Sequence, residues 1–472
     1  MPSIRKNLVY SILLVLANYL FPFLTYPYVS RVLGVDNIGA VNFVDSVINY
    51  FILFSMLGVE TFGVRELAKH RGHRDSLNKV FSSLFFINLG LTLIMLIVLV
   101  LVTFTVPTLA EHKELMFFGA FKLVFNCFLM EWLFKGLEDF RLISIRSIIV
   151  KTLYVVSVFV FIKRSDDVWK YYMLSCLMVV ANALVNMVAS RNRVRLTFKD
   201  LQIGETFKSV LGLGLYTILT SMYTTLNITY LGFVAGDTQV GYYTTATKLY
   251  GIIMALFTAF TGVMIPRMSN VVAEGDFDKF KSYYGLAVDL LFSFSFPLIV
   301  WMMLMAPDIV SVISGPGYEG SIVPMVIISP LLFIIGYEQI LALQTLLPLG
   351  RDSVLLRNSI VGAVMGVVLN VLLVPGLLAI GSACVWAACE LVILLLCQTA
   401  VTKEIRISFP YVTTAKNIIG YLPLALLMFV CSKLEVGLFV RLGLSMMVVA
   451  VYVFFFQLII NKRNIIKLVL RV

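Results

Sequence analysis

The chain has 472 residues, of which 60% are hydrophobic and only 13% are charged, and its formal net charge is +11. Soluble domains carry far more charge, so this composition excludes an ordinary soluble enzyme and favours a protein embedded mostly in lipid. The positive charge lies between apolar stretches, where contact with anionic lipid headgroups explains it without nucleic acid.

Fourteen apolar stretches follow one another along the chain. Each is about 17–25 residues long, which lets one helix cross the hydrocarbon core, and helices are expected because lipid offers no partners to unpaired backbone groups. The predicted spans cover residues 8–29, 38–59, 81–106, 115–134, 147–162, 169–190, 209–234, 241–265, 283–305, 322–347, 357–374, 378–399, 413–432 and 438–460. The sequence therefore predicts an all-α polytopic membrane protein with about 14 transmembrane helices.

Lysine and arginine are concentrated in every second gap between the predicted spans. If both termini are cytoplasmic, the inner segments hold 28 of the 37 basic residues, the outer segments hold seven, and Lys122 and Lys248 lie within spans. Short loops that are rich in lysine and arginine stay on the cytoplasmic side of a membrane. We therefore expect a multi-pass protein whose two termini are both cytoplasmic.

The sequence contains no motif that indicates a bound cofactor or metal. The six cysteines fall inside predicted spans, where cysteine packs as a small apolar residue, and no pair has the spacing of metal ligands. Residues 315–320 spell GxGxxG, but they follow an apolar helix and lack the strand that precedes a nucleotide-binding turn. We therefore expect neither a cofactor nor a metal, and no ATP site.

The two halves of the chain match each other at an offset of about 202 residues. Gly34 and Gly39 in LGVDNIGAVNF correspond to Gly236 and Gly241 in VAGDTQVGYYT. Six predicted spans separate the two copies, an even number, so the repeats are parallel and the substrate path is expected between them. The expected domains are an N-lobe at 1–200, a C-lobe at 201–405, and two added helices with a cytoplasmic tail at 406–472.

The two lysines inside predicted spans belong to different lobes. Lys122 and Lys248 both lie about seven residues from the outer end of a span, which is roughly 10 Å below the outer interface at about 1.5 Å per residue. An ionisable group at such a depth costs roughly 2.5–3.5 kcal/mol and therefore indicates a functional site. Two cations at matched depth suit an anionic cargo; alternatively, both side chains extend to the outer headgroups.

Carboxylates inside the spans are candidates for ion coupling. Glu390 lies near the middle of the twelfth span, Glu338 deep in the tenth and Asp45 in the outer half of the second. Asp289, in the ninth span, is a weaker candidate. Because desolvation favours the neutral form of a carboxyl group, such residues can bind and release H⁺ or Na⁺. The alternative is that each one neutralises a neighbouring lysine.

Three stretches of the sequence carry a family resemblance. The opening FPFLTYPYVSRVLGVDNIGAVNFVDSVINYFILFSMLGVETFGVREL, VGYYTTATKLYGII with GVMIPRMS, and SGPGYEGSIVPMVIISPLL resemble the polysaccharide transporter family. This family is the Wzx-type O-antigen flippase branch of the multidrug/oligosaccharidyl-lipid/polysaccharide exporter superfamily. The resemblance implies a fourteen-helix, two-lobed transporter of the bacterial inner membrane. It implies a cargo of undecaprenyl-diphosphate-linked oligosaccharide, flipped outward for O-antigen, capsule or exopolysaccharide synthesis.

The resemblance also suggests how the cargo is held during alternating access. Arg31 in PYVSRVLG and Lys248 in YYTTATKLY fall on commonly charged family positions, and together with Lys122 they are the expected ligands of the diphosphate. The residues expected to face the glycan are Asn18, Asn42, Asn49, Tyr223, Asn227 and Tyr243. Membrane lipids, the polysaccharide polymerase and the chain-length regulator are the other expected partners.

Other functions remain open from the sequence alone. A multidrug cation antiporter and a lipid II flippase share the superfamily architecture, although two buried lysines argue against a cavity for cationic drugs. A membrane enzyme is not expected, because no predicted external loop is long enough to carry a set of acids and bases. A simple channel is not excluded by any feature of the sequence.

Overall fold

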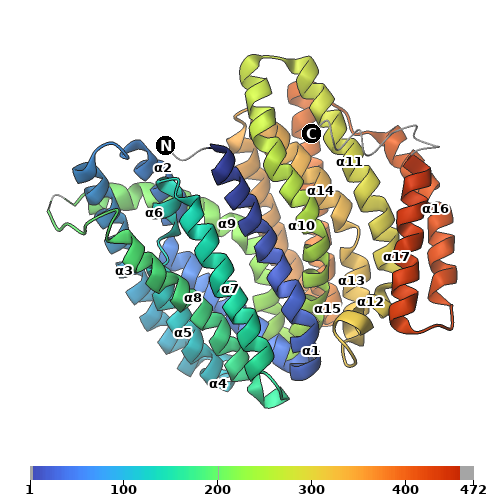
Figure 1. Ribbon diagram of the computed structural model, residues 1–472, viewed down its shortest axis with the longest axis horizontal. Helices are drawn as coiled ribbons and strands as arrows, with labels where there is room; N and C mark the ends of the chain where they lie inside the picture. The colour runs from blue at the N-terminus through green and yellow to red at the C-terminus, as the bar shows by residue number, and fades with distance from the viewer. Residues whose placement is uncertain (1–3, 200, 458–472) are drawn as a thin grey trace. The chain divides into compact units, whose positions relative to one another are not determined.

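The computed structural model describes residues 4–199 and 201–457; within these ranges it describes all side chains except those of 4–16, 19, 213, 215–217 and 219–224. The described part of the chain is helical and contains no strand, which confirms the predicted all-α class. It forms two compact units, residues 1–241 and 242–472, and each is considered by itself (Figure 1). The predicted division into 1–200, 201–405 and 406–472 stays a prediction.

Among the described residues, eleven helices are long and apolar enough to cross a membrane. Two of them, Leu20–Lys69 and Asp352–Ile405, are about fifty residues long. Asp352–Ile405 covers two of the predicted spans, and Leu20–Lys69 covers one and the end of another. The chain is therefore a multi-pass membrane protein. The count of fourteen spans stays a prediction, because it depends on where such long helices are divided.

The first unit is built around a long N-terminal helix. Its elements are α1 (Ile4–Met56), α2 (Val59–Lys69), α3 (Arg74–Thr105), α4 (Pro107–Glu111), α5 (Lys113–Cys127), α6 (Glu131–Gly136), α7 (Phe140–Phe161), η1 (Ser165–Asp167), α8 (Val168–Ser190) and α9 (Ile203–Ala235). Helix α1 packs against α3, α5, α7 and α9, so residues far apart in sequence meet along it (Figure 1). An apolar core with Trp132 and Phe134 at its centre joins α2, α3 and α6.

The second unit continues from α10, which starts in the first unit. Its elements are α10 (Asp237–Glu274), α11 (Phe277–Leu304), α12 (Ala306–Ile313), η2 (Glu319–Ser321), α13 (Ile322–Ile328), α14 (Leu331–Leu341), η3 (Ala342–Leu346), α15 (Asp352–Ile405), α16 (Tyr411–Ser432) and α17 (Leu438–Phe455). Helix α15 packs against α13 and α14, and α11 packs against α16. These contacts place the polar residues of α14 beside those of α15.

The predicted repeat is visible in the backbone. Helix α1 is interrupted at Gly34, with φ 79° and ψ 171°, and α9 ends at Gly236, with φ 80° and ψ 178°. The two glycines are 202 residues apart and have nearly the same conformation, although the flanking sequences differ. Each repeat therefore contains the same break between two consecutive helices.

The two repeat segments also touch each other, inside the first unit. A Cβ atom added to Gly39 would overlap the backbone oxygen of Asp237, and one added to Gly241 would overlap the backbone oxygen of Val35. Because 35 and 237, like 39 and 241, are equivalent repeat positions, the contact is reciprocal. The glycines thus permit a close backbone approach that larger residues would prevent.

Candidate functional site

A polar cluster lies inside the first unit where three helices meet. The Lys122 ammonium on α5 donates to Asp45 Oδ1 on α1 over 2.6 Å and to Asn49 Oδ1 over 3.1 Å. Asn49 in turn donates to Asp45 Oδ2 over 3.1 Å, and the Tyr172 hydroxyl on α8 donates to Asp45 Oδ1 over 3.2 Å. The cluster brings together three predicted residues, Asp45, Asn49 and Lys122. Tyr172 was not predicted, because nothing in its local sequence distinguishes it from a packing tyrosine.

The ion pair with Asp45 limits the ability of Lys122 to bind an anion. The lysine side chain is 15% exposed and lies against a carboxylate, so the pair is neutral as a whole. A diphosphate would have to compete with Asp45 for the ammonium group, or displace it. The structure therefore places Lys122 in an ion pair and not at an open cation site.

A second charged cluster joins α2, α6 and α7, and its member on α7, Arg146, was not predicted. Arg146 donates to Glu131 Oε1 over 2.9 Å, and Lys135 bonds Glu60 at 2.6 Å and Glu131 at 3.4 Å. The Arg146 side chain is only 3% exposed. The Glu131–Lys135 contact is the pairing expected from their spacing of four residues on a helix.

Lys151 lies on the same helix as Arg146 and donates to the side-chain oxygen of Asn18 on α1. Helix α7 continues on both sides of this lysine, from Phe140 to Phe161. The position of Lys151 inside the fifth predicted span, 147–162, could have identified it. Asn18 is a predicted glycan-facing residue, and the structure gives it a cation as neighbour.

The other predicted residues of the first unit make local contacts. Arg31 is exposed, and its guanidinium donates to the backbone oxygen of Pro27 over 2.8 Å. Asn42 donates to the backbone oxygen of Ile38 over 2.5 Å, and Asn227 is fully buried. The Tyr223 side chain lies outside the described residues.

The second unit contains a buried pair of carboxyl groups. Glu338 on α14 and Glu390 on α15 hydrogen-bond each other. The Trp386 indole donates to Glu390 Oε1 over 2.9 Å, and Glu390 is 4% exposed. A hydrogen bond between two carboxyl groups needs a proton, because two carboxylates are both acceptors. Two predicted ion-coupling residues, 52 positions apart in sequence, are thus brought together.

The remaining predicted residues of the second unit lie on α10 and α11. Tyr243 is buried, whereas Lys248 and Asp289 are half-buried, and all three interact with neighbours. All three belong to the second unit.

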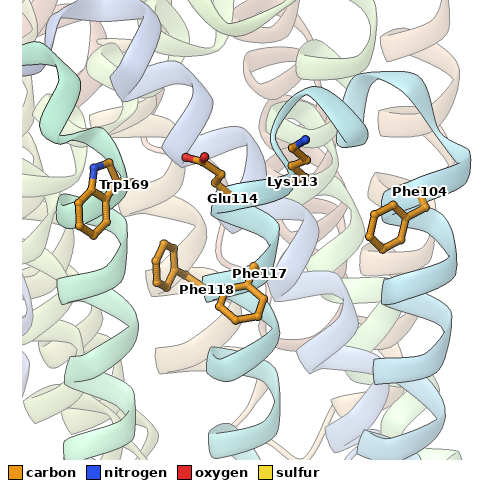
Figure 2. Close-up of a pocket in the computed structure, with 6 residues that line it drawn as sticks. All are labelled: Phe104, Lys113, Glu114, Phe117, Phe118 and Trp169. Carbon is orange, nitrogen blue, oxygen red and sulfur yellow. The ribbon is translucent and has the colours of Figure 1, made fainter.

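A hollow of about 550 Å³ lies at the ends of α3, α5 and α8, and Figure 2 shows its lining. The lining residues are Phe104, Lys113, Glu114, Phe117, Phe118 and Trp169. Phe104 is 74% exposed, and the rings of Phe118 and Trp169 stack at 6.3 Å. Aromatic side chains at helix ends are typical of the membrane interface. We therefore assign this hollow to lipid contact and not to the transport site.

A titratable contact lies beside the repeat glycines. Nε2 of His112, between α4 and α5, is 3.2 Å from Oδ2 of Asp237. The hydrogen bond to Asp237 raises the pKa of His112 above its usual value of 6.5, and the charges of Asp237 and Glu111 act in the same direction against the effect of burial. This contact ties the loop before α5 to the start of α10.

Comparison with known proteins shows which family shares these features. A candidate O-antigen transporter of Escherichia coli strain K12 is 26% identical over 359 residues, covering 73% of this chain and 84% of the relative. A candidate O-antigen transporter of Shigella dysenteriae is 24% identical over 371 residues, covering 76% and 90%. Both relatives are described as transporters, in agreement with the expectation that this chain is not an enzyme.

Solved structures of low sequence identity share the fold. The lipid II flippase MurJ in an inward closed conformation has a TM-score of 0.75 at 14% identity, covering 95% of this chain and 98% of that one. An inward-facing multidrug resistance MATE family transporter of the MOP superfamily has a TM-score of 0.64 at 16% identity, covering 83% and 96%. These likenesses establish the architecture alone.

The family itself is established by a match that runs through both charged clusters of the first unit. A family model described as "Polysaccharide biosynthesis protein" matches residues 4–272, which is more than half of the chain. The repeat glycines and the start of α10 also lie within the match. This chain belongs to the polysaccharide biosynthesis protein family.

Proposed function

We propose that this protein is a flippase that moves undecaprenyl-diphosphate-linked oligosaccharide repeat units across the bacterial inner membrane by alternating access. Family membership supports a role in polysaccharide synthesis, and the relatives described as candidate O-antigen transporters support transport. The observation that carries the proposal is the presence of cations within membrane helices. An anionic headgroup needs such cations because hydrocarbon does not solvate charge.

The diphosphate is held, in this proposal, by membrane cations. Lys122, Lys248 and Arg31 are the predicted ligands, and Lys122 serves only when Asp45 releases it. Polar side chains such as Asn42, together with the other predicted glycan-facing residues, hydrogen-bond the sugars. The prenyl chain stays in lipid, and no covalent step is required.

Ion coupling is assigned in this proposal to the carboxyl groups of the second unit. Glu338 and Glu390 exchange a proton with solvent during the cycle, and Trp386 holds Glu390 in place. Asp45 and Asp289 are the alternative coupling residues, and Na⁺ is the alternative ion. The ion-pair contact of Asp45 with Lys122 favours a role in binding over a role in coupling.

The proposed cargo determines the expected topology and protein partners. Both termini lie in the cytoplasm, the polysaccharide polymerase uses the flipped repeat units, and the chain-length regulator acts with it. A reporter fused to the carboxyl end tests the topology, because a fusion that is active only in the periplasm should be inactive.

A lipid II flippase is the second candidate, because the MurJ likeness has a TM-score of 0.75. The two candidates differ in phenotype. Loss of a lipid II flippase stops cell-wall synthesis, whereas loss of a flippase for surface polysaccharide removes the polymer and leaves growth intact.

Deletion of this protein in its own bacterium, followed by staining of surface glycan, tests the proposed function. We expect loss of polymer with normal growth, and restoration by the wild-type protein. Lys248→Ala and Lys122→Ala should restore less polymer at equal expression. Death of the deletion strain, rescued by a known lipid II flippase, would favour the second candidate.

A further inference from the structure

Helix α7 is long and apolar enough to cross a membrane, and two of its cations, Arg146 and Lys151, lie away from its ends. Arg146 and Lys151 lie five residues apart on a helix of 22 residues. At about 1.5 Å per residue, Lys151 is roughly 16 Å from the start of the helix, near its middle. That distance is too great for a lysine side chain to reach headgroups at either end. The cost of a charge at this depth therefore needs another explanation.

The charges around α7 do not balance. The linked group contains three cations, Lys135, Arg146 and Lys151, and two carboxylates, Glu60 and Glu131. The carboxylates contact Lys135 and Arg146, whereas Lys151 interacts with Glu131 only at longer range. One positive charge therefore remains in excess, and it is centred on Lys151.

The hydrogen-bond partners of Lys151 and Arg146 support an excess of positive charge. The side-chain partner of Lys151 is the neutral amide oxygen of Asn18. The buried Arg146 has two nitrogens, Nε and one terminal nitrogen, without a partner among the described residues. A buried donor without an acceptor is costly, so the charge of Arg146 is only partly compensated by its hydrogen bonds. Asn18 is exposed and Lys151 is half-exposed, so a ligand can reach the pair.

Lys122 provides the contrast within the same unit. Its ammonium lies 2.6 Å from the Asp45 carboxylate, so it carries no excess charge. Lys151, by contrast, donates to a neutral amide oxygen, and the neighbouring Arg146 keeps nitrogens without a partner among the described residues.

We propose that Lys151 and Asn18, beside the buried charge of Arg146, form an anion site in the first unit in addition to the predicted ligands, and that its ligand is the diphosphate of a prenyl-linked oligosaccharide. The identity of the ligand rests on the proposed function, whereas the location of the site rests on the charges and contacts of α7. Lys151 binds a phosphate oxygen directly, Asn18 orients Lys151, and the buried Arg146 adds its positive charge from the same helix. Helices α1 and α7 lie side by side and hold the three residues together (Figure 1).

Binding of undecaprenyl diphosphate to the purified full-length protein in nanodiscs tests the site. Lys151→Gln should weaken binding about ten- to a hundredfold, because one charge-assisted hydrogen bond to a phosphate is lost. Asn18→Asp should weaken it similarly, because the new carboxylate would neutralise Lys151 as Asp45 neutralises Lys122. Lys151→Arg should retain binding.

Two matched variants control for altered charge alone. Lys170→Gln removes a lysine that is paired with Asp167 at 2.6 Å at the end of α8. Asn37→Asp adds a carboxylate to α1 away from Lys151, where Asn37 bonds the backbone oxygens of Leu33 and Ser165. Both should bind the lipid as the wild type does. Thermal unfolding and size-exclusion profiles identify any variant that fails to fold, and Asn18→Asp then serves in place of Lys151→Gln.

The outcomes separate this inference from the proposed function. Unchanged binding by folded Lys151→Gln and Asn18→Asp, with loss in Lys122→Gln, overturns the α7 site and leaves the flippase proposal standing. If the wild type binds no undecaprenyl diphosphate, both proposals fall. Inorganic pyrophosphate is the competing probe: if it displaces the lipid at equal concentration, a soluble phosphoanion is the ligand and the lipid assignment is wrong.

Discussion

The hydroxyl of Thr238 donates a hydrogen bond of 2.6 Å to the carboxylate of Asp36, and the two residues are 202 positions apart. They occupy the same place in the two sequence repeats, so the repeats bond each other at equivalent positions. Around this bond, Gly39 meets the backbone of Asp237, and Gly241 meets that of Val35. The two repeat segments therefore resemble each other in sequence and also contact each other in the folded protein.

The close approach at Gly39 can be tested by adding one methyl group. Gly39→Ala should destabilise the protein by about 1–3 kcal/mol, because the Cβ overlaps a backbone oxygen that has little freedom to move. Thermal unfolding in detergent measures the effect. Gly90→Ala on α3 is the control, because its Cβ has open space and helix propensity favours alanine by about 0.5–1 kcal/mol. Equal melting temperatures for the two variants would show that the repeat contact is loose.

The contact of His112 with Asp237 predicts a pH-dependent stability. The pKa of His112 in the folded protein is raised above 6.5, mainly by the hydrogen bond to Asp237. Such a group stabilises the fold fully below its unfolded pKa, and this contribution is lost as the pH rises through the folded pKa. The melting temperature of the wild type should exceed that of His112→Gln by more at pH 5.5 than at pH 8.5. A difference that is constant over this range would contradict the charged pair.

The ion pair between Asp308 and Arg441 in the second unit predicts a large loss of stability when it is broken. The guanidinium on α17 bonds both carboxylate oxygens of Asp308 on α12, at 2.5 and 2.6 Å, and Asp308 is 8% exposed. Arg441→Met should cost roughly 3 kcal/mol, because it leaves a buried carboxylate without its partner. Adding Asp308→Asn to that variant should recover part of the loss.

The exposed pair of Arg351 and Glu404, at 2.6 Å, is the matched control. Because water screens it, Arg351→Met should cost about 0–1 kcal/mol. If chemical or thermal unfolding finds equal losses for Arg441→Met and Arg351→Met, then burial does not strengthen the Asp308 contact.

The paired carboxyl groups predict that one substitution can abolish transport without lowering the stability of the protein. Glu390→Gln keeps a hydrogen bond to Glu338, because the amide can donate, but it removes the shared proton. We expect the melting temperature of this variant to equal that of the wild type. In the deletion strain, we expect it to restore little surface polymer. Full complementation by Glu390→Gln would exclude this pair from coupling, whereas Glu404→Gln should complement fully because its carboxylate is exposed.

The fold was predictable because its determinants are local. Span length, apolar composition and the repeat glycines each depend on neighbouring residues, and they indicated an all-α membrane protein with two related halves. The place of the break in α15 was also predictable, because Pro375 and Gly376 separate the predicted spans 357–374 and 378–399. The conformation of Leu378 in the break, with φ 54° and ψ −129°, was not, since leucine rarely adopts a positive φ. It depends on the packing around it.

The candidate site was predictable only in part, because its contacts join distant segments. Lys122 and Asp45 were both identified as charges inside spans, but their pairing across 77 residues depends on how α5 lies against α1. Arg146 and Lys151 were missed because the end of a predicted span is uncertain by several residues, and a basic residue there resembles an inner loop. Glu338 and Glu390 were identified singly, and their hydrogen bond required the packing of α14 on α15.

Reconstituted flipping tests the central claim most directly. Proteoliposomes containing the purified protein and a fluorescent undecaprenyl-diphosphate oligosaccharide are exposed to a quencher that cannot cross the membrane. We predict that the protein moves the labelled sugar between leaflets, and that Lys151→Gln slows this movement. If the labelled lipid moves no faster than in protein-free vesicles, while the protein is folded and inserted, the chain is not a flippase for this cargo.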